Sequence, residues 1–238
     1  PVGAVYAKTK TLNNGTITMT GRPTDGAVAM YTKYGKVENS VSGKVNIEDD
    51  NSIGLYGIDS SQVLNTGTVN VKGNSSLGLY GVSDDLLNPT VTGASGVLLR
   101  QDATGIINVE GTDSAGIYGT KVRTVAGKTY IIENNGTINV NNGDSLGIYS
   151  DNVNVTTVGN INLNDISVNT AGNRVGVYAQ GTDATVTTTG ANINLGTKDQ
   201  TNIAYYVTNN AKLSGANLET VSGYGILTAI GLGDSFTH

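Results

Sequence analysis

Residue types that carry out acid–base or nucleophilic chemistry are scarce in this chain of 238 residues and do not cluster. Cysteine is absent, and the only histidine is the last residue, His238. The arginines lie far apart in the sequence, at Arg22, Arg100, Arg123 and Arg174. Histidine-based catalysis and a Ser/His/Asp triad therefore have no basis. A catalytic carboxylate pair is conceivable, but the sequence singles none out, and we expect a protein that is not an enzyme.

Tyrosines recur at regular intervals and are the first candidates for ligand binding. Aromatic faces can stack on sugar rings, so a stripe of tyrosines could line a glycan groove. The alternative, which we favour, is a structural ladder in which each ring covers its neighbour and the bare backbone beside a glycine. The tyrosines concerned are Tyr56, Tyr80, Tyr118, Tyr149, Tyr178 and Tyr206.

Two further sets of polar residues recur, and both have structural explanations. Asparagines at one repeated position predict a ladder of stacked amides; they are Asn46, Asn70, Asn108, Asn139, Asn162 and Asn194. Aspartate or asparagine also recurs in the turn before each tyrosine, at Asp25, Asp50, Asn74, Asp113, Asp144 and Asn173. Aligned carboxylates could bind Ca²⁺, but Asx turns explain the same residues. We expect neither a metal nor a cofactor.

Segments that interrupt the regular spacing are the remaining candidates, because loops on a rigid scaffold often carry function. Three such segments are 31–44, 82–89 and 121–132, and the last is basic in an acidic protein. Four residues of this last segment are candidates for ligand binding: Lys121, Arg123, Lys128 and Tyr130. Two tyrosines of the repeat, Tyr118 and Tyr149, complete the candidate set.

A repeated phrase provides the scaffold for all these residues. Its clearest copy runs from Gly136 to Tyr149, and related copies span 43–56, 67–80 and 105–118. In each copy an Ile or Val precedes the tyrosine by 11 residues. Repetition at a period of roughly 20–30 residues indicates a solenoid whose units stack upon one another.

Alternating apolar and polar residues, rich in Val, Ile, Thr and Tyr, predict two strands separated by a turn in each unit. We expect Ile138, Val140, Leu146 and Ile148 to face the core, and tyrosine to face outward with the glycine two residues before it. Counting Leu98 and Leu227 as tyrosine positions, and Leu213 as the last aliphatic partner, gives nine coils. The predicted fold is all-β, a right-handed parallel β-helix of about nine coils in one domain, 1–238.

Composition narrows the classes of partner. The net charge is −5 and the basic residues are scattered, which argues against nucleic-acid binding. No apolar run reaches 18 residues, so we expect no membrane insertion. Because the repeat pattern reaches both ends of the sequence, we expect the chain to be a segment of a longer protein.

The phrase at 134–149, with its copies at 65–80 and 42–56, resembles the passenger repeats of large fusobacterial type V autotransporter adhesins. The resemblance implies a right-handed β-helix displayed at the bacterial cell surface, or secreted, by a C-terminal β-barrel translocator elsewhere in the full-length protein. It also implies adhesion to host cells or coaggregation with other bacteria, through a glycan or protein receptor. No individual binding residue is implied by it.

These observations give one main hypothesis and three alternatives. The main hypothesis is an adhesive segment of a surface-displayed passenger. The alternatives are a non-binding stalk or spacer, a polysaccharide-active lyase or hydrolase, and a module whose flat face self-associates.

Overall fold

The computed structural model describes residues 10–21, 26–83, 98–122, 130–164, 172–197, 201–214, 221–223, 225–230 and 235–237. These residues form strands and turns, and no helix occurs among them. Each coil of the chain contains three short strands, and each strand pairs in parallel with the equivalent strand of the next coil. The result is three parallel sheets of nine, eight and eight strands.

The three sheets follow one another in every coil. The first, sheet A, contains β1 (Lys10–Asn13), β4 (Lys36–Asn39), β7 (Gln62–Asn65), β10 (Leu98–Gln101), β13 (Ile131–Asn134), β16 (Asn154–Thr157), β19 (Thr185–Thr188), β22 (Lys212–Ser214) and β25 (Ser235–Thr237). Sheet B contains β2 (Thr16–Met19), β5 (Lys44–Ile47), β8 (Thr68–Val71), β11 (Ile106–Val109), β14 (Thr137–Val140), β17 (Asn160–Leu163), β20 (Asn192–Asn194) and β23 (Val221–Ser222). Sheet C contains β3 (Val28–Lys33), β6 (Ile53–Ile58), β9 (Leu77–Ser83), β12 (Ala115–Lys121), β15 (Leu146–Asp151), β18 (Val175–Gln180), β21 (Ile203–Thr208) and β24 (Ile226–Ile230).

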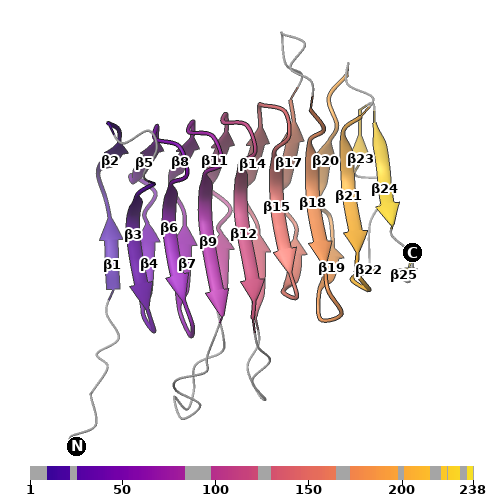
Figure 1. Cartoon of the computed structure of the whole chain (residues 1–238), viewed down its shortest axis with the longest axis horizontal. Helices are drawn as coiled ribbons and strands as arrows, with labels where there is room; N and C mark the ends of the chain where they lie inside the picture. The colour runs from indigo at the N-terminus through magenta and orange to yellow at the C-terminus, as the bar shows by residue number, and fades with distance from the viewer. Residues whose placement is uncertain are drawn as a thin grey trace, which may run out of the picture.

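The strands of sheet C run downward in Figure 1, and the chain returns upward behind them while it advances from left to right. This winding is right-handed, so the predicted right-handed parallel β-helix is confirmed. The predicted unit of two strands was incomplete, because the strands of sheet A are a third element of each coil. Those strands are only three or four residues long and differ in sequence between coils, so no repeated phrase marks them.

The core is a continuous column of aliphatic side chains inside the three sheets. Ile138, Val140 and Ile148 are fully buried, as predicted. Leu146 is only half-buried and lies on the outer side of sheet C, which corrects the prediction that it faces the core. The cause is Gly147: a Cβ built there would lie 3.0 Å from the Ile161 Cγ2 atom, so the glycine itself faces inward.

The same bend recurs in every described strand of sheet C from β6 to β18, and it explains the paired register. Leu146 pairs with Val175 and Ile148 with Val177, while the glycine between them is skipped. Each strand therefore turns an aliphatic residue outward, then glycine and an aliphatic residue inward, then tyrosine outward. The expectation that glycine shares the outer face with tyrosine was wrong, because strict alternation fails at this bend.

Three of the assignments behind the predicted coil count, those of Leu98, Leu227 and Leu213, need correction. Tyr80 pairs directly with Tyr118, so no coil separates them. Leu98 begins β10 of sheet A. At the C-terminal end, Tyr206 pairs with Ala229 rather than with Leu227. Leu213 likewise belongs to sheet A, where it pairs with Val186.

Candidate functional site

Seven tyrosines form one continuous column on the outer side of sheet C. Neighbouring ring centroids are 4.3–5.4 Å apart from Tyr31 to Tyr206. Four of the six contacts are stacked, with interplanar angles of 6–19°. The other two are a tilted contact between Tyr31 and Tyr56 and an edge contact between Tyr80 and Tyr118. The structural ladder predicted from the spacing is confirmed.

Stacking determines what these tyrosines can offer a ligand. The faces of the inner rings cover one another, so a sugar ring cannot stack on them. These rings are half-buried, so a partner could reach only their edges and hydroxyl groups, and the Tyr178 hydroxyl already lies 3.4 Å from Gln180 Oε1. Burial, followed by the neighbouring Tyr56 and Tyr118, raises the pKa of Tyr80 to about 12. Burial and the adjoining Tyr118 likewise raise the pKa of Tyr149. Tyr80 and Tyr149 therefore keep their phenolic protons at neutral pH and can donate hydrogen bonds.

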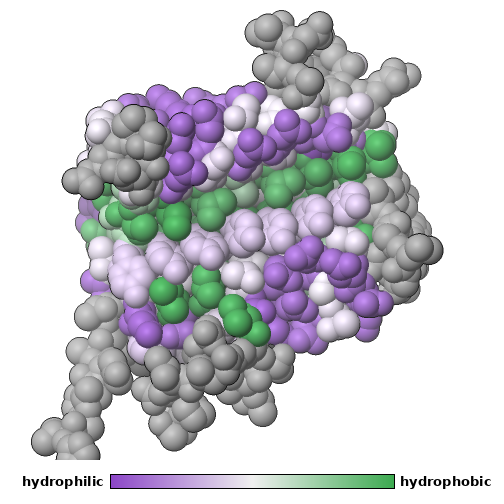
Figure 2. All heavy atoms as spheres, viewed as in Figure 1, coloured by the Kyte–Doolittle hydropathy of each residue, from purple (hydrophilic) through white to green (hydrophobic). Residues whose placement is uncertain are grey.

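An aliphatic row runs beside the tyrosines, and we call the two rows together the front face. Figure 2 shows them as a green band above a pale band that follows the length of the molecule. The aliphatic row comes from the first residue of each sheet C strand: Val28, Ile53, Leu77, Ala115, Leu146, Val175, Ile203 and Ile226. Ala115 and Val175 are buried, and the other six are half-buried or exposed. Neither row contains a charged residue, so the front face suits an uncharged partner surface.

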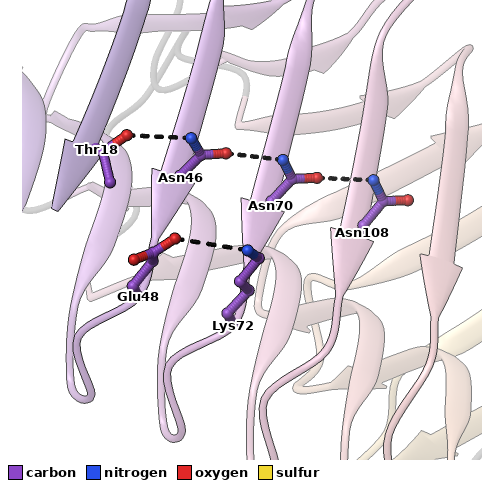
Figure 3. A network of polar contacts seen from close by, with 6 residues as sticks. All are labelled: Thr18, Asn46, Glu48, Asn70, Lys72 and Asn108. Carbon is purple, nitrogen blue, oxygen red and sulfur yellow. Dashed lines mark hydrogen bonds and ion pairs between the residues drawn. The ribbon is translucent and has the colours of Figure 1, made fainter. Parts of the chain in front are cut away.

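The outer side of sheet B carries the predicted asparagine ladder (Figure 3). Asn70 Nδ2 donates to Asn46 Oδ1 at 2.9 Å, and Asn108 Nδ2 donates to Asn70 Oδ1 at 2.8 Å. The chain of amides continues at 2.8 Å per step through Asn139 and Asn162. Because each of these amides is engaged by its neighbour, the column from Asn46 to Asn162 is a structural ladder, as expected. Asn194 is in register with Asn162, but its Oδ1 accepts a hydrogen bond from Gly196 N at 3.0 Å.

A second amide ladder is buried at the corner between sheets A and B, and sequence reasoning missed it. Asn39 Nδ2 donates to Asn65 Oδ1 at 2.8 Å, and Asn65 Nδ2 donates to Gln101 Oε1 at 2.7 Å. Asn65 also donates to the carbonyl oxygen of Gly67. These side chains are fully buried. The available signal was an asparagine two residues before a glycine, as in 13–15, 65–67 and 134–136.

The turns between sheets B and C account for most of the predicted aspartate and asparagine positions. Asn74 N donates to Asp50 Oδ1 at 2.7 Å, which is a hydrogen bond between neighbouring coils and not the local Asx turn that was expected. Asp113 and Asp144 have φ angles of 52° and 53°, a conformation that Asp and Asn tolerate better than most residues. Among the residues that the structure describes, no group of three or more His, Cys, Asp or Glu side chains could hold a metal ion. Position 25 lies outside those residues.

The candidate residues at 121–132 are only partly brought together. Lys121 ends β12 and forms an ion pair with Asp183, and its ammonium lies 5.6 Å from the ring centroid of Tyr130. The Lys121 side chain is 8% exposed and Tyr130 is 5% exposed, so both are largely inside the molecule. The interruption is also shorter than predicted, because Ile131 and Ile132 belong to β13.

The other candidates divide between the front face and residues that the structure does not describe. Tyr118 and Tyr149 are stacked at 4.3 Å in the tyrosine column, and Tyr118 lies three residues before Lys121 on β12. Arg123 and Lys128 lie outside the described residues. Ligand binding by these six residues stays a prediction.

The other two segments proposed as interruptions have different outcomes. Residues 31–44 are a regular part of the coil, formed by the end of β3, a turn, β4 and the corner that leads to β5. Two ion pairs involve lysines of this segment. Lys33 Nζ lies 3.5 Å from Asp59 Oδ2, and Lys36 Nζ lies 2.8 Å from Glu38 Oε2. Of residues 82–89, only 82 and 83 are described, and they end β9.

The two described arginines are engaged in contacts within the protein. Arg100 Nε donates to Glu133 Oε2 at 2.6 Å across sheet A, and this contact raises the pKa of Arg100. Arg174 is 1% exposed. It donates to Asn202 Oδ1 at 3.0 Å and to the carbonyl oxygen of Asn164. Arg22, like Arg123, lies outside the described residues.

Comparison with known proteins identifies the family. A family model described as the BigA third pectate lyase-like domain matches residues 2–190. Searches of curated proteins and of solved structures return no match. In the part of the chain that the structure describes, no helix is long and apolar enough to cross a membrane. Since the family model covers well over half of the sequence, this chain belongs to the family of the BigA third pectate lyase-like domain.

Proposed function

We propose that this chain is an adhesive segment of a surface-displayed, autotransporter-type passenger, with the front face as its receptor-binding surface. The observation that carries the proposal is the match of residues 2–190 to a domain of BigA, which is an autotransporter-like adhesin. The receptor is a glycan or protein on a host cell or on another bacterium. In the full-length protein, a C-terminal β-barrel translocator anchors the segment in the outer membrane.

The distribution of polar groups supports the front face as the binding surface. On sheet B, amides bind one another along the ladder from Asn46 to Asn162. On sheet A, charged groups form pairs such as Arg100 with Glu133. The front face instead presents uncharged aliphatic side chains beside a row of tyrosine hydroxyls. Tyrosine supplies large, rigid contact area at low entropic cost, which makes it frequent in binding surfaces.

The proposal excludes catalysis by this segment. β-Helices host several unrelated functions, so the fold does not decide the activity. The contacts of Arg100 and Arg174 with Glu133, Asn202 and Asn164 support a non-enzymatic function. Incubation with polygalacturonate and Ca²⁺ should give no unsaturated product, and turnover would favour the lyase alternative.

Binding of the purified chain to intact cells tests the proposal. Fluorescently labelled protein is titrated onto epithelial cells and onto partner bacteria, with galactose, N-acetylgalactosamine and arginine as competitors. Saturable binding is expected, and inhibition by a sugar would identify a glycan receptor. Absence of saturable binding by protein that circular dichroism shows to be β-rich would overturn the proposal in favour of a spacer.

A further inference from the structure

The sequence contains three Asn–Gly pairs, and one of them has an unusual local geometry. The pairs are Asn14–Gly15, Asn135–Gly136 and Asn142–Gly143. In the turn between β14 and β15, the backbone nitrogen of Gly143 lies 2.9 Å from Oδ1 of Asn142, the side chain that immediately precedes it. This contact holds the glycine nitrogen against the amide group of its own neighbour.

The first pair has a different arrangement. Gly15 N donates to Oδ1 of Asn13 at 3.1 Å, so a residue other than Asn14 holds the glycine nitrogen. In the second pair, the backbone nitrogen of Asn135 donates to the carbonyl oxygen of Gln101 at 2.8 Å, within the coil stack. Identical dipeptides therefore occupy three different environments in one molecule, which provides internal controls.

We propose that Asn142 is a site of spontaneous deamidation through a succinimide formed with Gly143. The deprotonated Gly143 nitrogen attacks Cγ of Asn142; the new N–Cγ bond forms, the Cγ–Nδ2 bond breaks, and ammonia leaves. Water then opens the ring at either carbonyl, which gives aspartate or isoaspartate. No oxidant or reductant takes part. A nucleophile already held beside its target needs little further ordering.

A second contact fixes the amide in this position. Asn142 Nδ2 donates to the carbonyl oxygen of Glu110 at 2.8 Å, in the preceding coil. The amide is thereby held between Glu110 on one side and the nitrogen of Gly143 on the other. Asn142 is half-buried rather than buried, so water can reach the succinimide for hydrolysis.

Deamidation would change the corner between sheets B and C. A carboxylate at position 142 cannot donate to the Glu110 carbonyl, and it adds a negative charge two residues before the exposed Asp144. Isoaspartate would also lengthen the backbone just ahead of Ser145, whose Oγ accepts a hydrogen bond from Ser114 N at 3.2 Å. The modification therefore weakens the contact between two successive coils.

Peptide mass spectrometry of the ageing protein tests the inference. The native chain and a urea-unfolded sample are incubated at mildly alkaline pH, and conversion of each Asn–Gly pair is followed over time. In the native chain Asn142 should convert roughly tenfold faster than Asn14 and Asn135, because its nucleophile is prepositioned. In urea the three rates should be similar. Equal rates in the native chain, or faster conversion at Asn14 or Asn135, would overturn the proposal.

Discussion

At the scale of single residues, asparagine has different energetic roles in the buried ladder and in the ladder on the outer side of sheet B. Asn65 is fully buried and satisfies neighbours on two sides, whereas Asn108 belongs to the half-exposed ladder on sheet B. A buried polar group that loses its partner cannot turn to water, while an exposed one can. The two ladders should therefore respond differently to the same substitution.

Asn65→Ala should lower the free energy of unfolding by about 2–3 kcal/mol, because it leaves the buried Gln101 Oε1 without its donor and removes the acceptor that Asn39 Nδ2 uses at 2.8 Å. Asn108→Ala is the matched control and should cost about 1 kcal/mol or less. Urea unfolding followed by circular dichroism measures both. Equal losses for the two variants would contradict the distinction between the buried and the exposed ladder.

The tyrosine column predicts a loss of stability at high pH. The pKa of Tyr80 is raised from 10.0 to about 12, mainly by burial. A raised pKa means that the folded state holds the phenolic proton more tightly than the unfolded state. The resulting stabilisation is complete below pH 10 and should disappear as the pH rises towards 12. Tyrosinate absorbance should show delayed ionisation in the native chain, and a titration that matches free tyrosine would contradict this.

Residue spacing was sufficient to predict the tyrosine and asparagine columns, because each recurs in nearly every copy of the phrase. It did not reveal the buried amides, since alternation assigns polar residues to the solvent side. Leu146 was misplaced for a related reason: a bend at Gly147 lets two successive residues face inward, which simple alternation does not allow for.

At the scale of elements, the glycines of sheet C determine how closely neighbouring coils approach. A Cβ added at Gly78 would lie 2.5 Å from the Gly116 carbonyl oxygen and 3.3 Å from the Ile107 Cγ2 atom. The first distance is to a backbone oxygen of the adjacent coil, so the clash can be relieved only by moving the two strands apart.

Gly78→Ala should therefore destabilise the protein by about 1–3 kcal/mol, as overpacking in a well-packed core does. Gly15→Ala is the control, since a Cβ there has no atom within 4 Å, and it should change stability by no more than about 0.5 kcal/mol. Thermal unfolding of both variants provides the comparison. A Gly78→Ala variant as stable as the wild type would show that the strands can shift without cost.

Sheets B and C were predictable as elements, because each carries half of the repeated phrase. Sheet A was not predictable, because the residues at its outward positions differ from coil to coil. One such position is occupied in successive coils by Lys36, Gln62, Leu98 and Ile131. The extra coil predicted at Leu98 is wrong for the same reason: without a recurring phrase, an aliphatic residue between Tyr80 and Tyr118 resembles a tyrosine position of a coil with short turns.

At the scale of the whole molecule, stacking produces a rod whose three sides differ in character. One side carries an amide ladder, one carries charged pairs, and the front face is uncharged with a row of hydroxyls. Coils that are not adjacent are also joined, as by the ion pair between Lys121 of β12 and Asp183, which follows β18. Such a rod is suited to present one long surface to a partner, and the front face is the surface that we propose for this role.

The most direct test is cell binding by a variant in which Tyr80, Tyr149 and Tyr178 are all replaced by phenylalanine. The substitutions keep the stacked rings and remove three hydroxyls, so the apparent Kd should weaken roughly tenfold or more if each hydroxyl contributes a typical hydrogen bond. Lys72→Gln, at an exposed position that follows β8 of sheet B, is the control and should bind like the wild type. Equal binding by the triple variant and the wild type would contradict the assignment of the front face as the receptor-binding surface.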